Sequence, residues 1–159
     1  AAQAPQFTAV LDPDAFLEPG HMPERIAAYC KKTNQKEPSQ PAQMVRTILE
    51  SLALRYRQVL EGLESVTGNP IEVIHIVGGG AKNTLLNQLV ADATGRTVVA
   101  GPTEATAAGN ILVQAIGAGI LRDLNELRGV VRDSFTLETY TPGDRSGWDH
   151  AYERYLSLL

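Results

Sequence analysis

IEVIHIVGGGAKN, residues 71–83, decides the fold of this 159-residue chain. A short apolar run ends abruptly in three glycines, Gly78, Gly79 and Gly80, and a helix-like pattern begins at about Asn83. Glycine lets the backbone come close to a ligand, and the first amides of a helix have no partner inside it. The stretch therefore predicts a strand, a glycine turn and a helix start that together present bare backbone amides to a phosphate.

Helical and strand patterns alternate on both sides of the glycine turn. Apolar residues recur every three or four positions between Met44 and Leu63, which predicts a long helix over 41–66 with this stripe facing the core. Because residues 71–77 are apolar on both faces, we expect a central strand covered on both sides. Together these patterns predict an α/β layered domain, with a small central sheet flanked by helices. The further expected helices are 83–94, 104–118, 121–132 and 148–158, and the further strands are 96–100 and 135–140.

The first 40 residues have a different character from the rest of the chain. Residues 22–32 predict a short helix, with Pro23 at a tolerated first-turn position. Prolines interrupt the remainder, and an apolar segment punctuated by proline usually lies over another part of a protein. We therefore expect residues 1–40 to pack on the rest of the protein, including a partner domain outside this sequence, and residues 41–159 to form the main domain.

Composition argues against several classes of protein. Hydrophobic residues make up 43% of the chain and charged residues 20%, as in ordinary globular domains, and the net charge of −4 argues against a general nucleic-acid binder. No apolar run is long enough for a membrane span, and the N-terminus lacks the features of a secretion signal. The single cysteine, Cys30, cannot form an internal disulfide, so we expect a cytoplasmic protein. No clustered ligand pattern indicates a metal site.

The glycine triplet fits neither of the two familiar phosphate-binding patterns. GGGAKN lacks the GK[ST] ending of a Walker A loop and the G-x-G-x-x-G spacing of a dinucleotide fingerprint. Many α/β proteins need glycine at this position only to turn tightly, and that interpretation stays open at this point. Contact between the backbone amides and a phosphate or adenosine stays open as well.

Three polar residues near the glycines each have a structural and a functional interpretation. Lys82 either attracts a phosphate or is simply solvated. Asn83 is a natural N-cap, and its amide could also meet the sugar or base of a nucleotide. Glu104 lies in the first turn of the expected helix 104–118, where the helix dipole stabilises a carboxylate, or it orients the neighbouring loop. The small residues that follow Glu104 suggest close packing of this helix against the helix 83–94.

The segment 74–119 resembles the nucleotide-side half of the FGGY carbohydrate kinases. The combination of GGG-A-x-N with GP-x-E-A-x-x-x-GN carries the resemblance. The segments 16–30, 45–68 and 135–155 most resemble the subgroup that phosphorylates L-rhamnulose, so the resemblance covers nearly the whole chain. This chain has Thr47, Val90 and Thr94 where some members of that subgroup have extra cysteines, which excludes a disulfide of that kind here.

The resemblance implies a two-domain kinase with an actin-like, ribonuclease-H-like core in each half. This chain corresponds to the later part of the C-terminal half, which closes over ATP and its Mg2+. The catalytic aspartate and most sugar contacts would therefore lie upstream, so no catalytic residue is assigned in this chain. Gly79 matches the ATP-contact glycine of the family, with Gly78 and Gly80 shaping the same loop. Asn83 matches a position near the adenosine, and Glu104 an acidic residue with an indirect role.

The function implied is transfer of the γ-phosphoryl group of ATP to a sugar hydroxyl, the 1-hydroxyl if the substrate is L-rhamnulose. Alternatives are a kinase for xylulose, fuculose or glycerol, a non-catalytic ATP-binding regulatory module of the same fold, and an interaction domain whose glycine turn is only a turn. This chain alone is expected to be inactive. An isolated half of a cleft is also open to self-association through an exposed apolar face.

Overall fold

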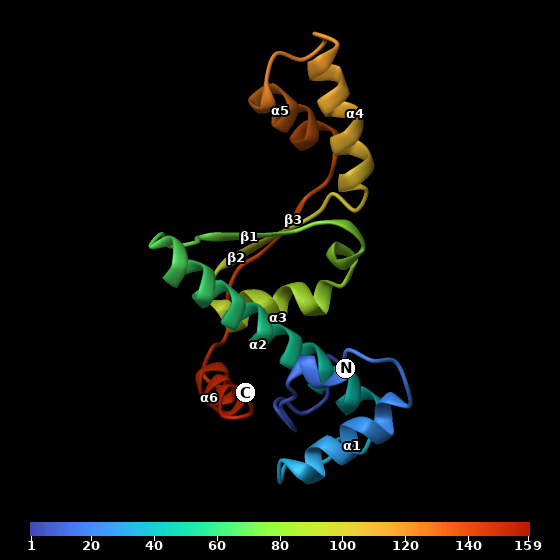
Figure 1. Cartoon of the computed structure of the whole chain (residues 1–159), viewed down its shortest axis with the longest axis vertical. Helices are drawn as coiled ribbons and strands as arrows, with labels where there is room; N and C mark the ends of the chain where they lie inside the picture. Colours follow the sequence, from blue (N-terminus) through green and yellow to red (C-terminus); the bar gives the residue numbers. More distant parts are fainter.

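The computed structural model describes all 159 residues as a mixed α/β chain (Figure 1). Every helix and strand expected from the sequence is present, with ends shifted by up to three residues. The elements are η1 (Pro13–Phe16), α1 (Met22–Lys32), α2 (Pro41–Thr67), β1 (Val73–Ile76), η2 (Gly78–Lys82), α3 (Thr84–Thr94), β2 (Thr97–Ala100), α4 (Ala105–Gly117), α5 (Leu124–Ser134), β3 (Glu138–Tyr140) and α6 (Trp148–Leu156).

Three short strands form one sheet in the order β1–β2–β3. Strand β1 runs parallel to β2 with Val73 opposite Thr97, and β3 runs antiparallel to β2 with Tyr140 opposite Val98. The expected edge position of β3 is confirmed. The expectation of a central, doubly covered β1 is wrong for this chain, because β1 pairs on one side only. Its residues Val73 and His75 are exposed on the face that no helix covers.

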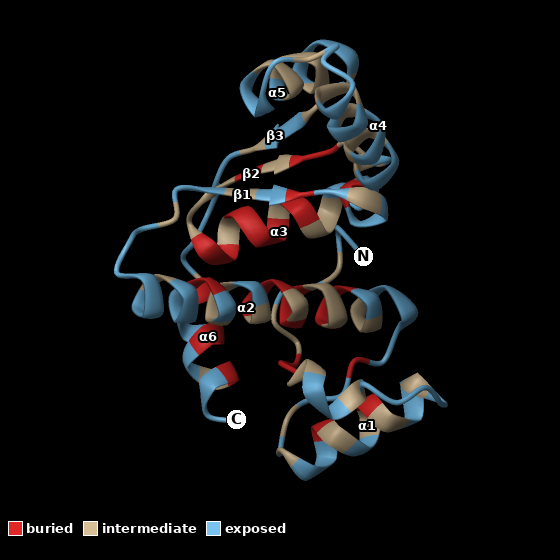
Figure 2. Cartoon of the chain, turned by 45° about the horizontal axis from the view of Figure 1, so that its top comes forward, coloured by how far each residue is buried: buried red, intermediate tan, exposed pale blue.

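The core lies between the sheet, α3 and α2 (Figure 2). Helix α3 packs against both α2 and β2, and its buried residues include Leu89, Val90 and Ala93. Helix α6 closes the end of this core with three aromatic residues on one face, Trp148, Tyr152 and Tyr155, all buried. This aromatic face therefore has a packing role. The helices α2 and α3 position the glycine turn through the first residues of α3.

Helix α2 buries a face that coincides only in part with the one that its apolar spacing predicts. The N-terminal segment and α3 contact the side that carries Arg46, Glu50 and Leu54, all of which are buried. Much of the expected inward stripe is exposed instead. The exposed apolar residues of α2 are Val45, Tyr56, Val59, Leu63 and Val66. The periodicity correctly gave the helix but could not say which of two usable faces this chain would cover.

The N-terminal segment is held to α2 and α6 by side chains rather than by a strand ladder. The Phe7 amide donates to Glu50 Oε2 at 2.8 Å, and the Phe7 ring meets the Trp148 ring edge-on. The Gln35 side chain bonds both the amide and the carbonyl of Val10 at 2.8 Å. Residues 1–40 thus contact the rest of this chain, and their division from 41–159 as a separate unit stays a prediction.

Helices α4 and α5 form a hairpin, residues 105–134, at one end of the molecule (Figures 1 and 2). Neither helix has a buried residue, and α5 is the element that α4 chiefly contacts. The expected close packing of α4 against α3 is therefore wrong, because the small residues Ala107 and Ala108 face no helix of the core. Helix α5 begins later than expected because Asp123 caps it, accepting hydrogen bonds from the amides of Asn125 and Glu126.

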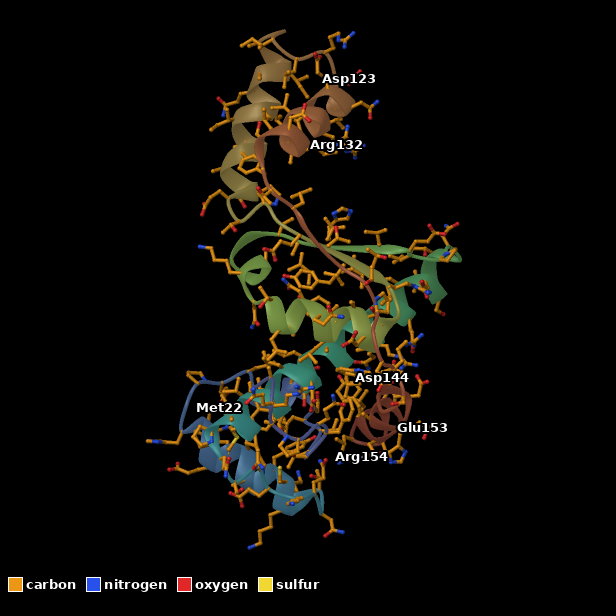
Figure 3. The ribbon with its side chains drawn as sticks, turned by 180° about the vertical axis from the view of Figure 1, so that it is seen from behind. Met22, Asp123, Arg132, Asp144, Glu153 and Arg154 are labelled. Carbon is orange, nitrogen blue, oxygen red and sulfur yellow. The ribbon has the colours of Figure 1, made fainter.

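The hairpin and the N-terminal region occupy opposite ends of the molecule. Figure 3 shows Asp123 and Arg132 of the hairpin at one end, and Met22, Glu153 and Arg154 at the other. The sheet and the glycine turn lie between them. None of the helices combines the length and apolar character that crossing a membrane requires.

Candidate nucleotide-binding site

The glycine triplet forms a short helical turn at the carboxyl end of β1. Residues 78–82 are η2, a single 3-10 turn entered from extended backbone at Val77. The Gly78 amide donates to the Pro102 carbonyl oxygen at 3.0 Å, and the Gly101 amide donates to the Ile76 carbonyl oxygen at 2.8 Å. These two bonds hold the turn beside the loop that follows β2. The sequence segments 78–83 and 101–104, far apart in the chain, therefore meet at one end of the sheet.

The three glycines differ in whether backbone conformation or a close contact disfavours a side chain at that position. Gly78 has a φ of +74°, a conformation that disfavours side chains, and a Cβ on Gly80 would make ordinary contact with Ile76 at 3.6 Å. Gly79 has neither constraint, because nothing in the chain apart from adjoining residues lies within 4 Å of a Cβ built there. Its amide sits in the first part of a helical turn, where no intrahelical partner is available. The chain thus leaves open space directly above Gly79.

Asn83 is the N-cap of α3, as its sequence context suggests. Its side-chain oxygen Oδ1 accepts a hydrogen bond from the Leu86 amide at 3.1 Å. Its Nδ2 group has no hydrogen-bond partner in the structure, and the residue is exposed. Capping therefore occupies the acceptor of the side chain and leaves the donor available to a ligand.

Glu104 lies just before its helix, whereas we expected it in the first turn. It occupies the N-cap position of α4, and its carboxylate makes no capping hydrogen bond. The side chain of Glu104 is exposed. The backbone carbonyl oxygen of Glu104 accepts a hydrogen bond from the Ala108 amide at 3.0 Å. No contact of the carboxylate orients the neighbouring loop in this structure, so the indirect role proposed for Glu104 stays a prediction.

The glycine turn presents an open surface rather than an enclosed pocket. The cavity nearest to it has a volume of about 260 Å³ and lies beside the turn, between the loop 100–103 and the start of β3. Its lining residues are Ala81, Lys82, Thr84, Ala100, Gly101, Thr103, Thr136 and Glu138. Two of three larger cavities, of about 480 and about 450 Å³, lie around α1 and the first half of α2, and none of the three shares a residue with the turn.

One residue that contacts the glycine turn was missed by sequence reasoning. Asn87, in the first half of α3, donates from Nδ2 to the Ala81 carbonyl oxygen at 2.9 Å and is fully buried. An asparagine within an otherwise apolar helix face, four residues after an N-cap, was the signal that could have identified it. By contrast, no group of three or more His, Cys, Asp or Glu side chains could hold a metal ion in the structure.

The family assignment follows from comparison with known proteins. Residues 1–118 match the model of the FGGY family of carbohydrate kinases, C-terminal domain. This chain therefore belongs to the FGGY family of carbohydrate kinases, as its glycine turn and its GPTEA segment suggested. Among its relatives, the rhamnulokinase of Bacteroides thetaiotaomicron is 50% identical over 155 residues, which are 96% of this chain and 32% of that protein. The rhamnulokinase of Bacillus subtilis is 46% identical over 84% of this chain and 28% of that protein.

Solved structures confirm the fold at lower sequence similarity. A xyloylose kinase from Brucella ovis superposes with a TM-score of 0.60 at 24% identity, over 77% of this chain and 25% of that one. Plasmodium falciparum glycerol kinase, solved with ADP, superposes with a TM-score of 0.60 at 19% identity. The superposition covers 79% of this chain and 25% of the glycerol kinase. The expected α/β fold, part of an actin-like ATPase domain, is therefore correct. The chain spans about a third of the length of the relatives it matches.

Proposed function

We propose that this chain is the nucleotide-binding part of an ATP-dependent kinase that converts L-rhamnulose to L-rhamnulose 1-phosphate. The observation that carries the proposal is the similarity to rhamnulokinases, 50% and 46% identical over most of this chain. The wider similarity to xylulose and glycerol kinases supports sugar or polyol phosphorylation in general. The chain spans about a third of these relatives, which supports the proposal that the remaining contacts, including the catalytic base and most sugar contacts, come from residues outside this sequence.

In this proposal the glycine turn binds the phosphates of ATP. The open space above Gly79 admits a phosphate oxygen, and the backbone amide there donates without a side chain in the way. The free Nδ2 group of Asn83, at the entry of α3, faces the adenosine. Phosphoryl transfer depends mainly on positioning and charge neutralisation, so a rigid turn that fixes the nucleotide is a sufficient role for this chain.

Mg2+ enters with the nucleotide rather than from a cage in this chain. No carboxylate cluster of the structure fits a protein-held cation, so the ion would be held by the phosphates and by residues outside this sequence. When bound, the ion neutralises the charge on the transferred phosphoryl group. We place the enzyme in the cytoplasm, in keeping with the single free thiol of Cys30, which is buried.

A substrate panel with the full-length protein tests the proposal. ATP consumption is measured with L-rhamnulose, L-fuculose, xylulose and glycerol, and kcat/KM is expected to be highest for L-rhamnulose. The 159-residue chain alone is expected to phosphorylate none of them. Equal or higher efficiency with another sugar would contradict the assigned substrate, and absence of activity with all four would contradict a sugar-kinase function.

A further inference from the structure

Asn87 is a buried polar residue of α3, the helix that packs against the sheet. It has no exposed surface, and its neighbours along α3 include the buried residues Leu89, Val90 and Ala91. Burying a side-chain amide costs free energy unless its groups are hydrogen-bonded. The backbone amide of Asn87 already serves the helix, donating to the Asn83 carbonyl oxygen at 3.0 Å. The reason for an asparagine here must therefore come from its side chain.

The Asn87 side chain reaches the glycine turn. Its Nδ2 donates to the carbonyl oxygen of Ala81, which is the only hydrogen bond from any side chain to the backbone of residues 78–82. At the other end of the turn, the Gly78 amide bonds to the Pro102 carbonyl oxygen. The turn is thus fixed at both ends, by main chain at Gly78 and by side chain at Ala81. Gly79 is exposed between these two residues, and the two hydrogen bonds fix the orientation of its backbone amide.

Burying the Asn87 side chain also costs free energy in a way that packing alone does not explain. Asn87 Oδ1 is buried and accepts no hydrogen bond. An apolar side chain of similar size would avoid that unpaired acceptor.

We propose that Asn87 is a positioning residue for nucleotide binding, which holds Ala81 so that the Gly79 amide points at a phosphate of the nucleotide. This inference rests on the proposed function of the glycine turn and adds a buried residue that the nucleotide does not touch. A positioning role predicts weaker nucleotide binding without a matching loss of fold, because the lost hydrogen bond acts on the geometry of the turn.

The test compares two Asn87 variants with a matched control in the full-length protein. Asn87→Leu removes the hydrogen bond to Ala81, and Asn87→Ala does so without any risk of overpacking. Thr94→Val is the control, because it removes another buried hydrogen bond of α3, from Thr94 Oγ1 to the Val90 carbonyl oxygen at 2.7 Å, at the end of α3 remote from the turn. The readouts are the Kd for ATP, KM for ATP against KM for the sugar, and amide hydrogen exchange over residues 78–83.

The positioning role predicts about a fivefold rise in Kd and KM for ATP in both Asn87 variants, the size expected for one lost hydrogen bond. Hydrogen exchange over 78–83 becomes faster, and KM for the sugar stays unchanged. Thr94→Val leaves all of these values as in the wild type. Asn87 variants that bind ATP within twofold of wild type would overturn the inference, as would an equal effect in Thr94→Val. Gly79→Asp, tested in parallel, separates this result from failure of the nucleotide site itself.

Discussion

The amide of Gly78 donates to the carbonyl oxygen of Pro102 at 3.0 Å, joining two sequence motifs that lie more than twenty residues apart. The bond places the glycine turn against the loop that leads into α4. Because the neighbouring Gly101 amide bonds back to Ile76, the two connections between strand and helix are held as one unit. These bonds fix the backbone around Gly79 to the sheet, which suits a site that works by positioning its ligand.

Gly101 should tolerate substitution poorly. Its φ is +110°, and a Cβ there would lie 3.3 Å from both the Thr136 carbonyl oxygen and the Leu137 side chain. Gly101→Ala is therefore expected to lower the free energy of unfolding by about 1–3 kcal/mol. Urea denaturation of the chain measures the change, with Gly79→Ala as the control. An unchanged midpoint in Gly101→Ala would show that the loop relaxes without cost.

The buried pair of Arg46 and Glu50 should be sensitive to removal of one partner. Arg46 Nε donates to Glu50 Oε1 at 2.7 Å, and the two side chains are 7% and 1% exposed. Arg46→Met leaves the carboxylate buried without its cation, which is expected to cost about 3 kcal/mol or more. The double variant Arg46→Met/Glu50→Leu should recover part of that loss, as measured by urea denaturation. A double variant less stable than Arg46→Met would contradict this account.

Stability should also depend on pH through Glu50. Burial raises the pKa of Glu50 above its ordinary value, although hydrogen bonds from Arg46 and the Phe7 amide oppose the shift. Because the folded state holds this proton more tightly, the contribution of Glu50 is fully present below the ordinary glutamate pKa and is lost as pH rises through the folded value. Relative to Glu50→Gln, the wild type should lose stability over that range. Urea midpoints measured from about pH 4 to about pH 8 give the comparison, and a relative gain would refute it.

The isolated chain should self-associate through α2. Val45, Tyr56, Val59, Leu63 and Val66 share one face of this helix, and each is at least 38% exposed. We expect size-exclusion chromatography with light scattering to give a mass above the 17.1 kDa of one chain, because a continuous apolar stripe of this length rarely stays uncovered. Leu63→Lys should shift the mass toward a monomer. The control Ser65→Lys adds the same charge off the stripe, and an equal effect of both variants would argue against this surface.

The sequence predicted elements better than it predicted their partners. Local signals fixed most boundaries, such as Gly68 and Gly95, which end α2 and α3 in the left-handed conformation. The position of β1 in the sheet was mispredicted because apolar residues on both faces of a strand do not reveal which neighbours this chain supplies. Asn87 was missed for a related reason, since its hydrogen bond to Ala81 depends on how α3 meets the turn. Motif resemblance gave the family, which no periodicity could give.

Nucleotide binding by the full-length Gly79→Asp variant tests the central claim most directly. Apart from adjoining residues, no atom of the chain lies within 4 Å of a Cβ at Gly79, so the fold accommodates a Cβ there without a clash. Gly62→Asp on α2 is the matched control, because a Cβ there also has no neighbour within 4 Å. Isothermal titration with ATP should show at least a tenfold weaker Kd for Gly79→Asp, since the carboxylate repels the phosphates, and an unchanged Kd for Gly62→Asp. Wild-type affinity in a folded Gly79→Asp protein would contradict the assignment of the glycine turn to the nucleotide.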